Sequence, residues 1–133
     1  MKALILDSEA ISQLARGKSG RAKTLYSEAV NNSVLVAVPA AVLAEQFRGG
    51  KHDQVLQSFL ARNRWIAIYD TDIKLAQSIG HLLAKAQLGS EHHVDGAVVA
   101  TALDMGGGVI LTSDPNDLER IAAGHPAIKI IPL

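Results

Sequence analysis

The chain alternates between short apolar runs and segments in which apolar residues recur at helical spacing. Strands are predicted at five runs rich in Val, Ile and Leu, which cover residues 3–6, 34–38, 65–69, 109–112 and 128–131. Helical spacing between these runs predicts helices over residues 8–14, 22–30, 40–48, 53–60, 73–86, 95–103 and 115–122. Strands that alternate with helices are typical of a parallel sheet covered by helices on both faces. The pattern therefore predicts an α/β fold, in a single domain over residues 1–133.

Residues 95–118 form the stretch around which the rest is organised. The helix predicted at its start is apolar on every side, which indicates a buried helix. Three glycines, 106–108, are expected to end that helix, because glycine adopts the left-handed C-cap conformation without a Cβ penalty. The apolar run after the glycines suits a central parallel strand. Asp114 then suits a helix N-cap and Pro115 the first helical position.

Acidic residues lie at the ends of two predicted strands. Asp7 follows the first strand, and Asp114 follows the fourth. Ser8, directly after Asp7, can cap the next helix. Ligand sites of doubly wound sheets form outside the carboxyl ends of strands, where the strand order reverses. If these two strands are neighbours, they lie about 5 Å apart. Asp95 begins the helix that leads into the fourth strand, so we expect it near the opposite edge of the sheet unless that segment folds back.

Composition excludes several kinds of chemistry. The chain has no cysteine, which excludes disulfides, thiolate zinc sites and cysteine nucleophiles and fits a reducing compartment. No apolar run approaches the roughly 20 residues of a membrane span, and the N-terminus becomes acidic too early for a signal peptide, so we expect a cytoplasmic protein without a membrane partner. Thirteen basic residues balance thirteen acidic ones, so any nucleic-acid surface must be local.

Four pieces of sequence carry a resemblance to a known family. They are ALILD with Asp7, PAAVLAEQ with Glu45, VDGAVVATA with Asp95 and ILTSDPNDL with Asp114. In this order, across nearly all 133 residues, they resemble a PIN domain, specifically a VapC-type toxin of a bacterial type II toxin–antitoxin pair. The chain departs from the family at Glu9-Ala10, where a bulkier apolar residue is common, and this difference affects helix packing more than the acids.

The resemblance implies a fold, an activity and partners. The fold is a PIN-like three-layer α/β fold whose parallel sheet has the order 3-2-1-4-5, which places Asp7 beside Asp114. The activity is that of a Mg²⁺- or Mn²⁺-dependent endoribonuclease, with Asp7, Glu45, Asp95 and Asp114 as catalytic metal ligands and Asp117 as a further candidate ligand. The implied partners are an RNA substrate, a VapB-type antitoxin whose tail offers a basic side chain to the acids, and a second copy in a homodimer.

The chemistry of such a reaction suits these residue types. Mg²⁺ is a hard cation that prefers oxygen ligands, and a bound divalent cation offsets the charge of a scissile phosphate and makes a water more acidic. Thr112 and Ser113 are expected either to position a phosphate or a water or to serve as local caps.

Each of these residues also has a structural interpretation. Asp7 and Asp114 suit strand ends and helix caps, Asp95 suits the positive end of a helix dipole, and Glu45 and Asp117 suit a solvated surface. His92 and His93 are interpreted as solvated loop residues, since adjacent histidines do not share a helix face. The basic segment 16–23 contains Arg16, Lys18, Arg21 and Lys23, which suit either RNA phosphates or a solvated loop. Caps and surface charges are expected at Asp53, Asp70, Asp72 and Asp104.

Two other functions remain open. A phosphoacceptor signalling domain would use Asp70 after the third strand, but it needs paired acids after the first strand, and Asp7-Ser8-Glu9 has the wrong spacing. A noncatalytic interaction module of the same fold would show no metal-dependent cleavage of RNA. The apolar helices that contain Leu14, Leu25 and Val30 would supply an antitoxin groove, a homodimer face or simply core.

Overall fold

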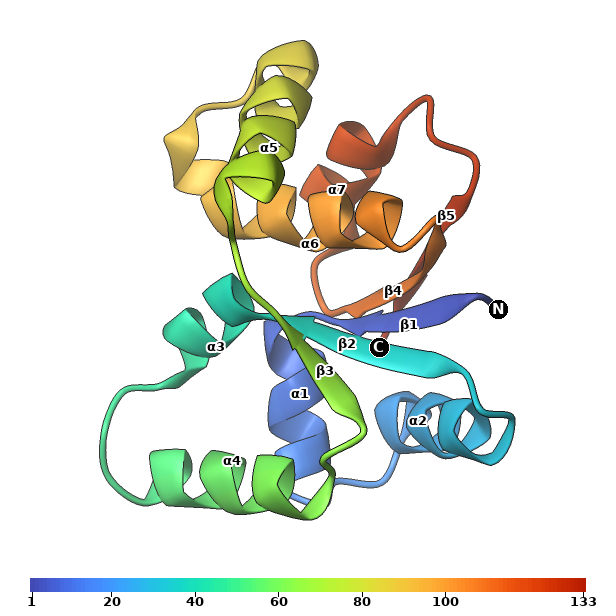
Figure 1. The fold of residues 1–133 in the computed structure, drawn as a ribbon. Coiled ribbons are helices and arrows are strands. Elements are labelled where there is room, and N and C mark those ends of the chain that lie inside the picture. Colours follow the sequence, from blue (N-terminus) through green and yellow to red (C-terminus); the bar gives the residue numbers. More distant parts are fainter.

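The computed structural model describes residues 1–133 and shows a parallel sheet between two layers of helices (Figure 1). The strands are β1 (Ala3–Leu6), β2 (Leu35–Pro39), β3 (Ile66–Tyr69), β4 (Gly108–Thr112) and β5 (Ile128–Pro132). All neighbouring strands pair in parallel, in the order β3-β2-β1-β4-β5. The predicted α/β class and the strand order implied by the resemblance are both confirmed.

Helices cover both faces of the sheet. One face carries α5 (Ile73–Ala86), α6 (His93–Asp104) and α7 (Pro115–Ala122), and the other carries α1 (Ser8–Ala15), α2 (Arg21–Asn31) and α4 (Lys51–Arg62). The short α3 (Ala40–Gln46) follows β2 directly at the carboxyl edge of the sheet (Figure 1). None of these helices combines the length and hydropathy that crossing a membrane requires.

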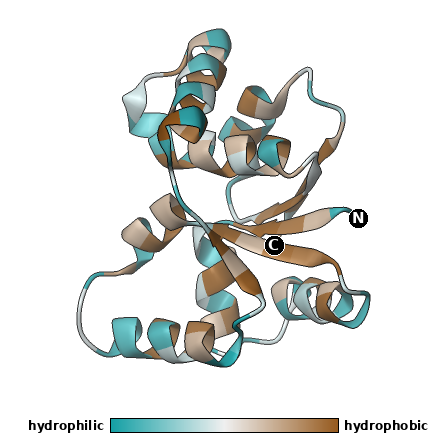
Figure 2. Cartoon of the chain, in the orientation of Figure 1, coloured by the Kyte–Doolittle hydropathy of each residue, from teal (hydrophilic) through white to brown (hydrophobic).

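The central strands and α6 form the apolar centre of the molecule. All residues of β1 and β4 are buried, and Figure 2 shows the strands as mainly hydrophobic, whereas most helices have a hydrophilic outer side. The middle of α6, from Gly96 to Ala102, is buried as its apolar sequence predicts. Two glycines after α6 are required by close backbone approach: a Cβ would lie 2.7 Å from the carbonyl oxygen of Ala127 at Gly107 and 2.6 Å from that of Ala3 at Gly108.

Some of the predicted helix ends and caps differ from those in the structure. Asp7, rather than Ser8, is the N-cap of α1, and its carboxylate accepts a hydrogen bond from the Ser8 backbone N–H at 2.8 Å. The helix predicted from Asp53 begins at Lys51; Asp53 instead accepts bonds from the backbone of the preceding turn. The helix predicted over residues 40–48 ends at Gln46, because Phe47 is extended. Asp72 does cap α5, where it accepts from the Leu75 N–H.

Asp95 does not lie near the opposite edge of the sheet, because the segment before it folds back, which is the exception that the prediction allowed. Two helices connect β3 to β4: α5 leads away from the carboxyl end of β3, and the chain then returns, so that α6 begins at the carboxyl edge and ends at the amino edge, where β4 starts (Figure 1). Asp95 is in the first turn of α6, close enough to Asp7 for the Asp7 carboxylate to raise its pKa. This return of the chain after α5 brings Asp95 to the strand ends.

Candidate metal centre

Asp7 is the most buried acid at the carboxyl edge. Its backbone N–H donates to the Leu111 carbonyl at 3.1 Å, which continues the β1–β4 ladder by one residue. The residue is 9% exposed, and its two carboxylate oxygens accept separate hydrogen bonds, from the Ser8 N–H and from the Thr112 hydroxyl, each at 2.8 Å. Asp7 is therefore held rigidly between the end of β1 and the end of β4.

Burial is the main cause of a raised pKa at Asp7. The bonds from Thr112 and Ser8 oppose this shift, whereas the negative charges of Glu45 and Asp114 add to it. The structure thus places both predicted acids near Asp7. Glu45 is exposed on α3, and Asp114 is exposed at the N-cap of α7, where its side chain makes no capping bond.

Ser8 and Thr112 connect the acids to one another. The Ser8 hydroxyl donates to Glu45 Oε1 at 2.6 Å, which links the start of α1 to α3. The Thr112 hydroxyl donates to Asp7 Oδ2 and accepts from the Asp114 backbone N–H at 3.0 Å. Thr112 is fully buried, so it positions Asp7 rather than a phosphate. Ser113, which was predicted with it, is exposed.

Asp95 and Asp117 form a second part of the site. The pKa of Asp95 is raised, mainly by burial and then by the charge of Asp7, with a smaller contribution from Asp117, whereas His92 opposes the shift. Asp117 lies in the first turn of α7, opposite the first turn of α6. We refer to Asp7, Glu45, Asp95, Asp114 and Asp117 as the acidic cluster. All five predicted ligands therefore lie at the carboxyl edge of the sheet, where α1, α3, α6 and α7 begin.

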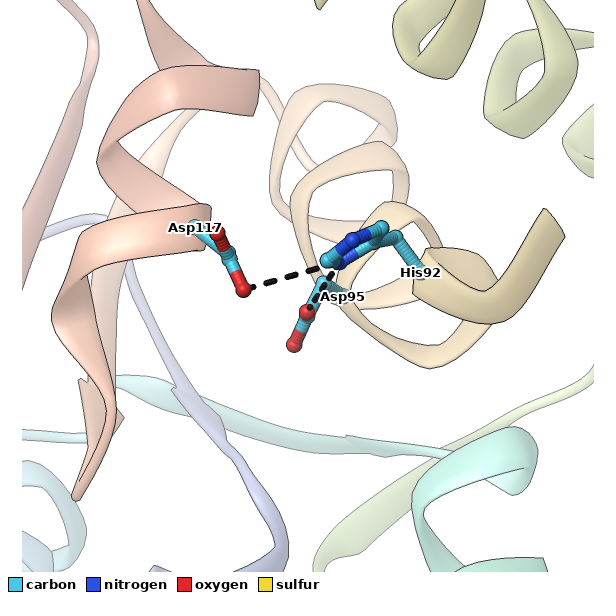
Figure 3. Close-up of side chains that lie close together, drawn as sticks. All are labelled: His92, Asp95 and Asp117. Atoms are coloured by element: carbon cyan, nitrogen blue, oxygen red, sulfur yellow. Dashed lines mark hydrogen bonds and ion pairs between the residues drawn. The ribbon is translucent and has the colours of Figure 1, made fainter. Parts of the chain in front are cut away.

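His92 was missed by the sequence interpretation. It is not a solvated loop residue: its side chain is 22% exposed, and its Nδ1 lies 3.5 Å from Asp95 Oδ2 and 3.5 Å from Asp117 Oδ2 (Figure 3). Ligand atoms of His92, Asp95 and Asp117 all lie within 4.8 Å of one another, a group that does not include Asp7, Glu45 or Asp114. The signal was present in the sequence as the i,i+3 spacing of His92 and Asp95, which places both on one helix face.

No lysine or arginine forms an ion pair with the acidic cluster. One ion pair in the structure involves an arginine or lysine, and it joins Arg16 to Glu9. The other ion pairs all involve His92. Buried or half-buried carboxylates are costly unless they are paired or bind a cation. The donor set, which is oxygen-rich and uncompensated, therefore fits a divalent cation such as Mg²⁺ or Mn²⁺.

The basic segment 16–23 is partly occupied by contacts within the chain. Arg16 pairs with Glu9 at 2.9 Å, and Arg21 donates to the Pro132 carbonyl at 2.7 Å. Lys18 and Lys23 are exposed and form no ion pair, so they are the two cations of this segment that are free to contact another molecule.

Solved structures of the same fold come from toxin–antitoxin systems. A chain in the crystal structure of VapBC2 from Rickettsia felis, bound to a DNA fragment of its promoter, matches with a TM-score of 0.71 and 18% identity over 98% of each chain. A toxin–antitoxin complex from Klebsiella pneumoniae matches with a TM-score of 0.64 and 19% identity over 94% of each chain. VapBC-5 from Mycobacterium tuberculosis matches with a TM-score of 0.58 and 16% identity over the whole of both chains.

These matches establish the fold. No family model and no curated protein matches the sequence, and the identities to the solved structures are below 20%. The class that strand order and helix layers define is the three-layer α/β fold with a 3-2-1-4-5 sheet. Within that class, the chain has the PIN-like fold, in the form found in VapBC toxin–antitoxin structures.

Proposed function

We propose that the chain is a metal-dependent endoribonuclease that acts as the toxin of a toxin–antitoxin pair. The observation that carries this proposal is the acidic cluster at the point where the strand order reverses, between β1 and β4. No lysine or arginine forms an ion pair with the cluster. Ligand sites of open α/β sheets form at such points. The VapBC structures of the same fold support the toxin–antitoxin role.

The residues of the site divide into two groups by what they do. Asp7, Glu45, Asp95, Asp114 and Asp117 would hold Mg²⁺ or Mn²⁺, which, when bound, offsets charge on the scissile phosphate and makes a water more acidic. Ser8 and Thr112 orient Glu45 and Asp7 through hydroxyl hydrogen bonds of 2.6 and 2.8 Å. Burial and mutual repulsion raise the pKa values of Asp7 and Asp95. A bound cation would lower both values again, because a nearby positive charge favours the ionised carboxylates.

Cleavage of RNA with and without metal tests the activity. The purified chain is incubated with an RNA that contains single-stranded loops, in Mg²⁺, in Mn²⁺ and in EDTA. We expect cleavage only with metal, and we expect Asp7→Asn and Asp114→Ala to lose at least about a hundredfold in rate. The control is Asp70→Asn, an exposed acid at the end of the edge strand β3, which should retain the parent rate. Equal cleavage in EDTA, or equal cleavage by Asp114→Ala, contradicts the proposal.

Strand order and the position of Asp70 argue against the phosphoacceptor signalling domain. Phosphoacceptor domains of flavodoxin-like type have the strand order 2-1-3-4-5, whereas this sheet has the order 3-2-1-4-5. Asp70 follows β3, which is separated from β1 by β2, so it lies about 10 Å across the sheet from Asp7. Incubation with acetyl phosphate should therefore leave no phosphate on Asp70, and a noncatalytic module would leave the RNA intact in every metal.

An antitoxin partner is the second element of the proposal. A VapB-type antitoxin would place a basic side chain on the acidic cluster, and an arginine matches carboxylates bidentately. Coexpression with the neighbouring reading frame should give a stable complex that cleaves RNA more slowly than the free chain. A complex that cleaves as fast as the free chain excludes this form of inhibition.

A further inference from the structure

His92 adds a nitrogen atom to a site otherwise made of oxygen atoms. It is the last residue of the 3₁₀ turn Ser90–His92, directly before α6, so its side chain lies on the same face as Asp95. Figure 3 shows His92, Asp95 and Asp117 pointing toward one another from the start of α6 and the start of α7. Helix starts on two different elements therefore place one imidazole between two carboxylates.

The distances suit ligand atoms of one cation better than hydrogen bonds. Nδ1 is 3.5 Å from each of the two carboxylate oxygens, which is at the long limit for a hydrogen bond, and its single proton can serve only one of them. Metal–ligand bonds of about 2.1 Å separate neighbouring ligand atoms by about 3.0 Å in an octahedral site and about 3.4 Å in a tetrahedral site. The two separations of 3.5 Å from Nδ1 need little adjustment to reach these values, and the third pair of ligand atoms lies within 4.8 Å.

The other ring nitrogen of His92 faces a carboxylate of its own. Nε2 lies 3.9 Å from Glu91 Oε1, an exposed side chain. Histidines that bind metals commonly donate their second N–H to a carboxylate, which fixes the ring orientation and the tautomer. The tautomer that carries its proton on Nε2, on the side of Glu91, directs the Nδ1 lone pair to the two aspartates. The adjacent His93 is exposed and is outside the group formed by His92, Asp95 and Asp117, so it provides a matched control.

We propose that His92 is a nitrogen ligand of the cation held by Asp95 and Asp117, and that it makes the site prefer Mn²⁺ to Mg²⁺. This inference rests on the proposed function, because it assigns a cation preference to the same acidic cluster. Mg²⁺ takes oxygen ligands almost exclusively, whereas imidazole is a good ligand for first-row transition metals, whose affinity for nitrogen rises along the series from Mn²⁺. An imidazole in place of a carboxylate or a water therefore strengthens Mn²⁺ binding and contributes little to Mg²⁺ binding.

Electron paramagnetic resonance of bound Mn²⁺ tests this without reference to activity. The whole chain is titrated with MnCl₂, the free ion is quantified from its signal, and electron spin-echo modulation detects directly coordinated nitrogen. We expect ¹⁴N coupling in the parent, a changed pattern in protein labelled with ¹⁵N-histidine, and no coupling in His92→Gln. The Mn²⁺ dissociation constant of His92→Gln should rise by at least about tenfold, and its Mg²⁺ dissociation constant should change by less than about threefold. His93→Gln should behave as the parent.

A second variant keeps the test independent of the stability of His92→Gln. The chain has five histidines, so replacement of the other four leaves His92 as the single imidazole, and this variant should retain the nitrogen coupling. Tight Mn²⁺ binding without nitrogen coupling overturns the role of His92 and leaves the proposed function standing. Coupling that persists in His92→Gln assigns the ligand to another histidine and also overturns it. Absence of Mn²⁺ binding by the parent overturns both proposals.

Discussion

Thr112 donates its hydroxyl hydrogen bond to Asp7 across 105 positions of sequence, at 2.8 Å and in a fully buried setting. The same hydroxyl oxygen accepts the Asp114 backbone N–H, so one side chain fixes an acid at the end of β1 and the start of α7. Parallel pairing of β1 with β4 makes this contact possible, because Leu6 lies opposite Leu111 and the next residue of each strand completes the ladder. The arrangement of the site therefore depends on a residue that is itself fully buried.

Replacement of Thr112 by valine tests this dependence. Valine keeps the shape but leaves Asp7 Oδ2 and the Asp114 N–H without their partner, so we expect the free energy of unfolding to fall by about 1–3 kcal/mol. The pKa of Asp7 should rise further, since the Thr112 bond lowers it. Thr112→Ser keeps the hydroxyl and should stay closer to the parent in both respects. Urea unfolding and NMR titration of the Asp7 carboxyl measure the two effects. A Thr112→Val protein as stable as Thr112→Ser would show that the hydroxyl is dispensable.

The sequence predicted most of the strands and helices because their apolar spacing was clear. The all-apolar helix around Val98 and the β-branched run at Val109 are both buried where the pattern placed them. Helix starts were less certain, since Asp7 and Ser8 are both good caps and only the strand end decides between them. The position of Asp95 could not be predicted from local spacing, because two helices connect β3 to β4 and their spacing does not show at which edge the second begins.

The acidic residues were predicted through a family resemblance, and their contacts were not. Nothing local in the sequence pairs Ser8 with Glu45 or Thr112 with Asp7, because these contacts join segments that only the sheet order brings together. His92 was interpreted as a loop residue because the adjacent His93 does not share its helix face, whereas its relevant partner is three residues further on, at Asp95. The link to Asp117 depends on α6 and α7 packing side by side, which no local pattern encodes.

Neutralising Asp7 should stabilise the metal-free protein. Its pKa is raised above the unfolded value of 3.8, mainly by burial, so the folded state binds more protons than the unfolded state between pH 3.8 and the folded pKa. Stability therefore falls as the pH rises through that window and stays reduced above it. In EDTA at pH 7, Asp7→Asn should unfold at a higher temperature than the parent, and the difference should vanish below about pH 3.8. Added Mn²⁺ should stabilise the parent more than the variant.

A matched control for this experiment is Asp72→Asn. Asp72 is also an N-cap whose side chain accepts a backbone N–H, but it lies outside the acidic cluster. Asparagine caps helices about as well as aspartate, so this substitution should leave the melting temperature in EDTA nearly unchanged. If Asp7→Asn melts below the parent in EDTA at pH 7, Asp7 acts as a structural cap and not as a member of a repelling cluster.

Thr101 is a buried polar residue without a partner. It lies on α6, is fully buried, and its hydroxyl oxygen makes no hydrogen bond. Thr101→Val removes a desolvated hydroxyl at nearly constant volume, so we expect stabilisation of about 1 kcal/mol, or a rise of a few degrees in melting temperature. Thr112→Val is the informative comparison, since the same substitution at a hydrogen-bonded threonine should have the opposite sign. A Thr101→Val protein that melts lower than the parent would indicate that this hydroxyl has a partner in solution.

Two glycines on packed helices should respond to alanine in opposite directions. At Gly96, next to Asp95 in the buried part of α6, an added Cβ would lie 2.9 Å from Ile79 Cγ2 and 3.3 Å from Leu83 on α5. Both neighbours are buried, so Gly96→Ala should force α5 and α6 apart and cost about 1–3 kcal/mol. Gly80, on the exposed side of α5, has open space around an added Cβ, and Gly80→Ala should stabilise the helix by up to about 1 kcal/mol because alanine has the higher helix propensity. Thermal unfolding in EDTA measures both variants without a contribution from metal. If Gly96→Ala is as stable as Gly80→Ala, the α5–α6 contact is looser than the distance of 2.9 Å implies, and the first turn that carries Asp95 is less firmly held.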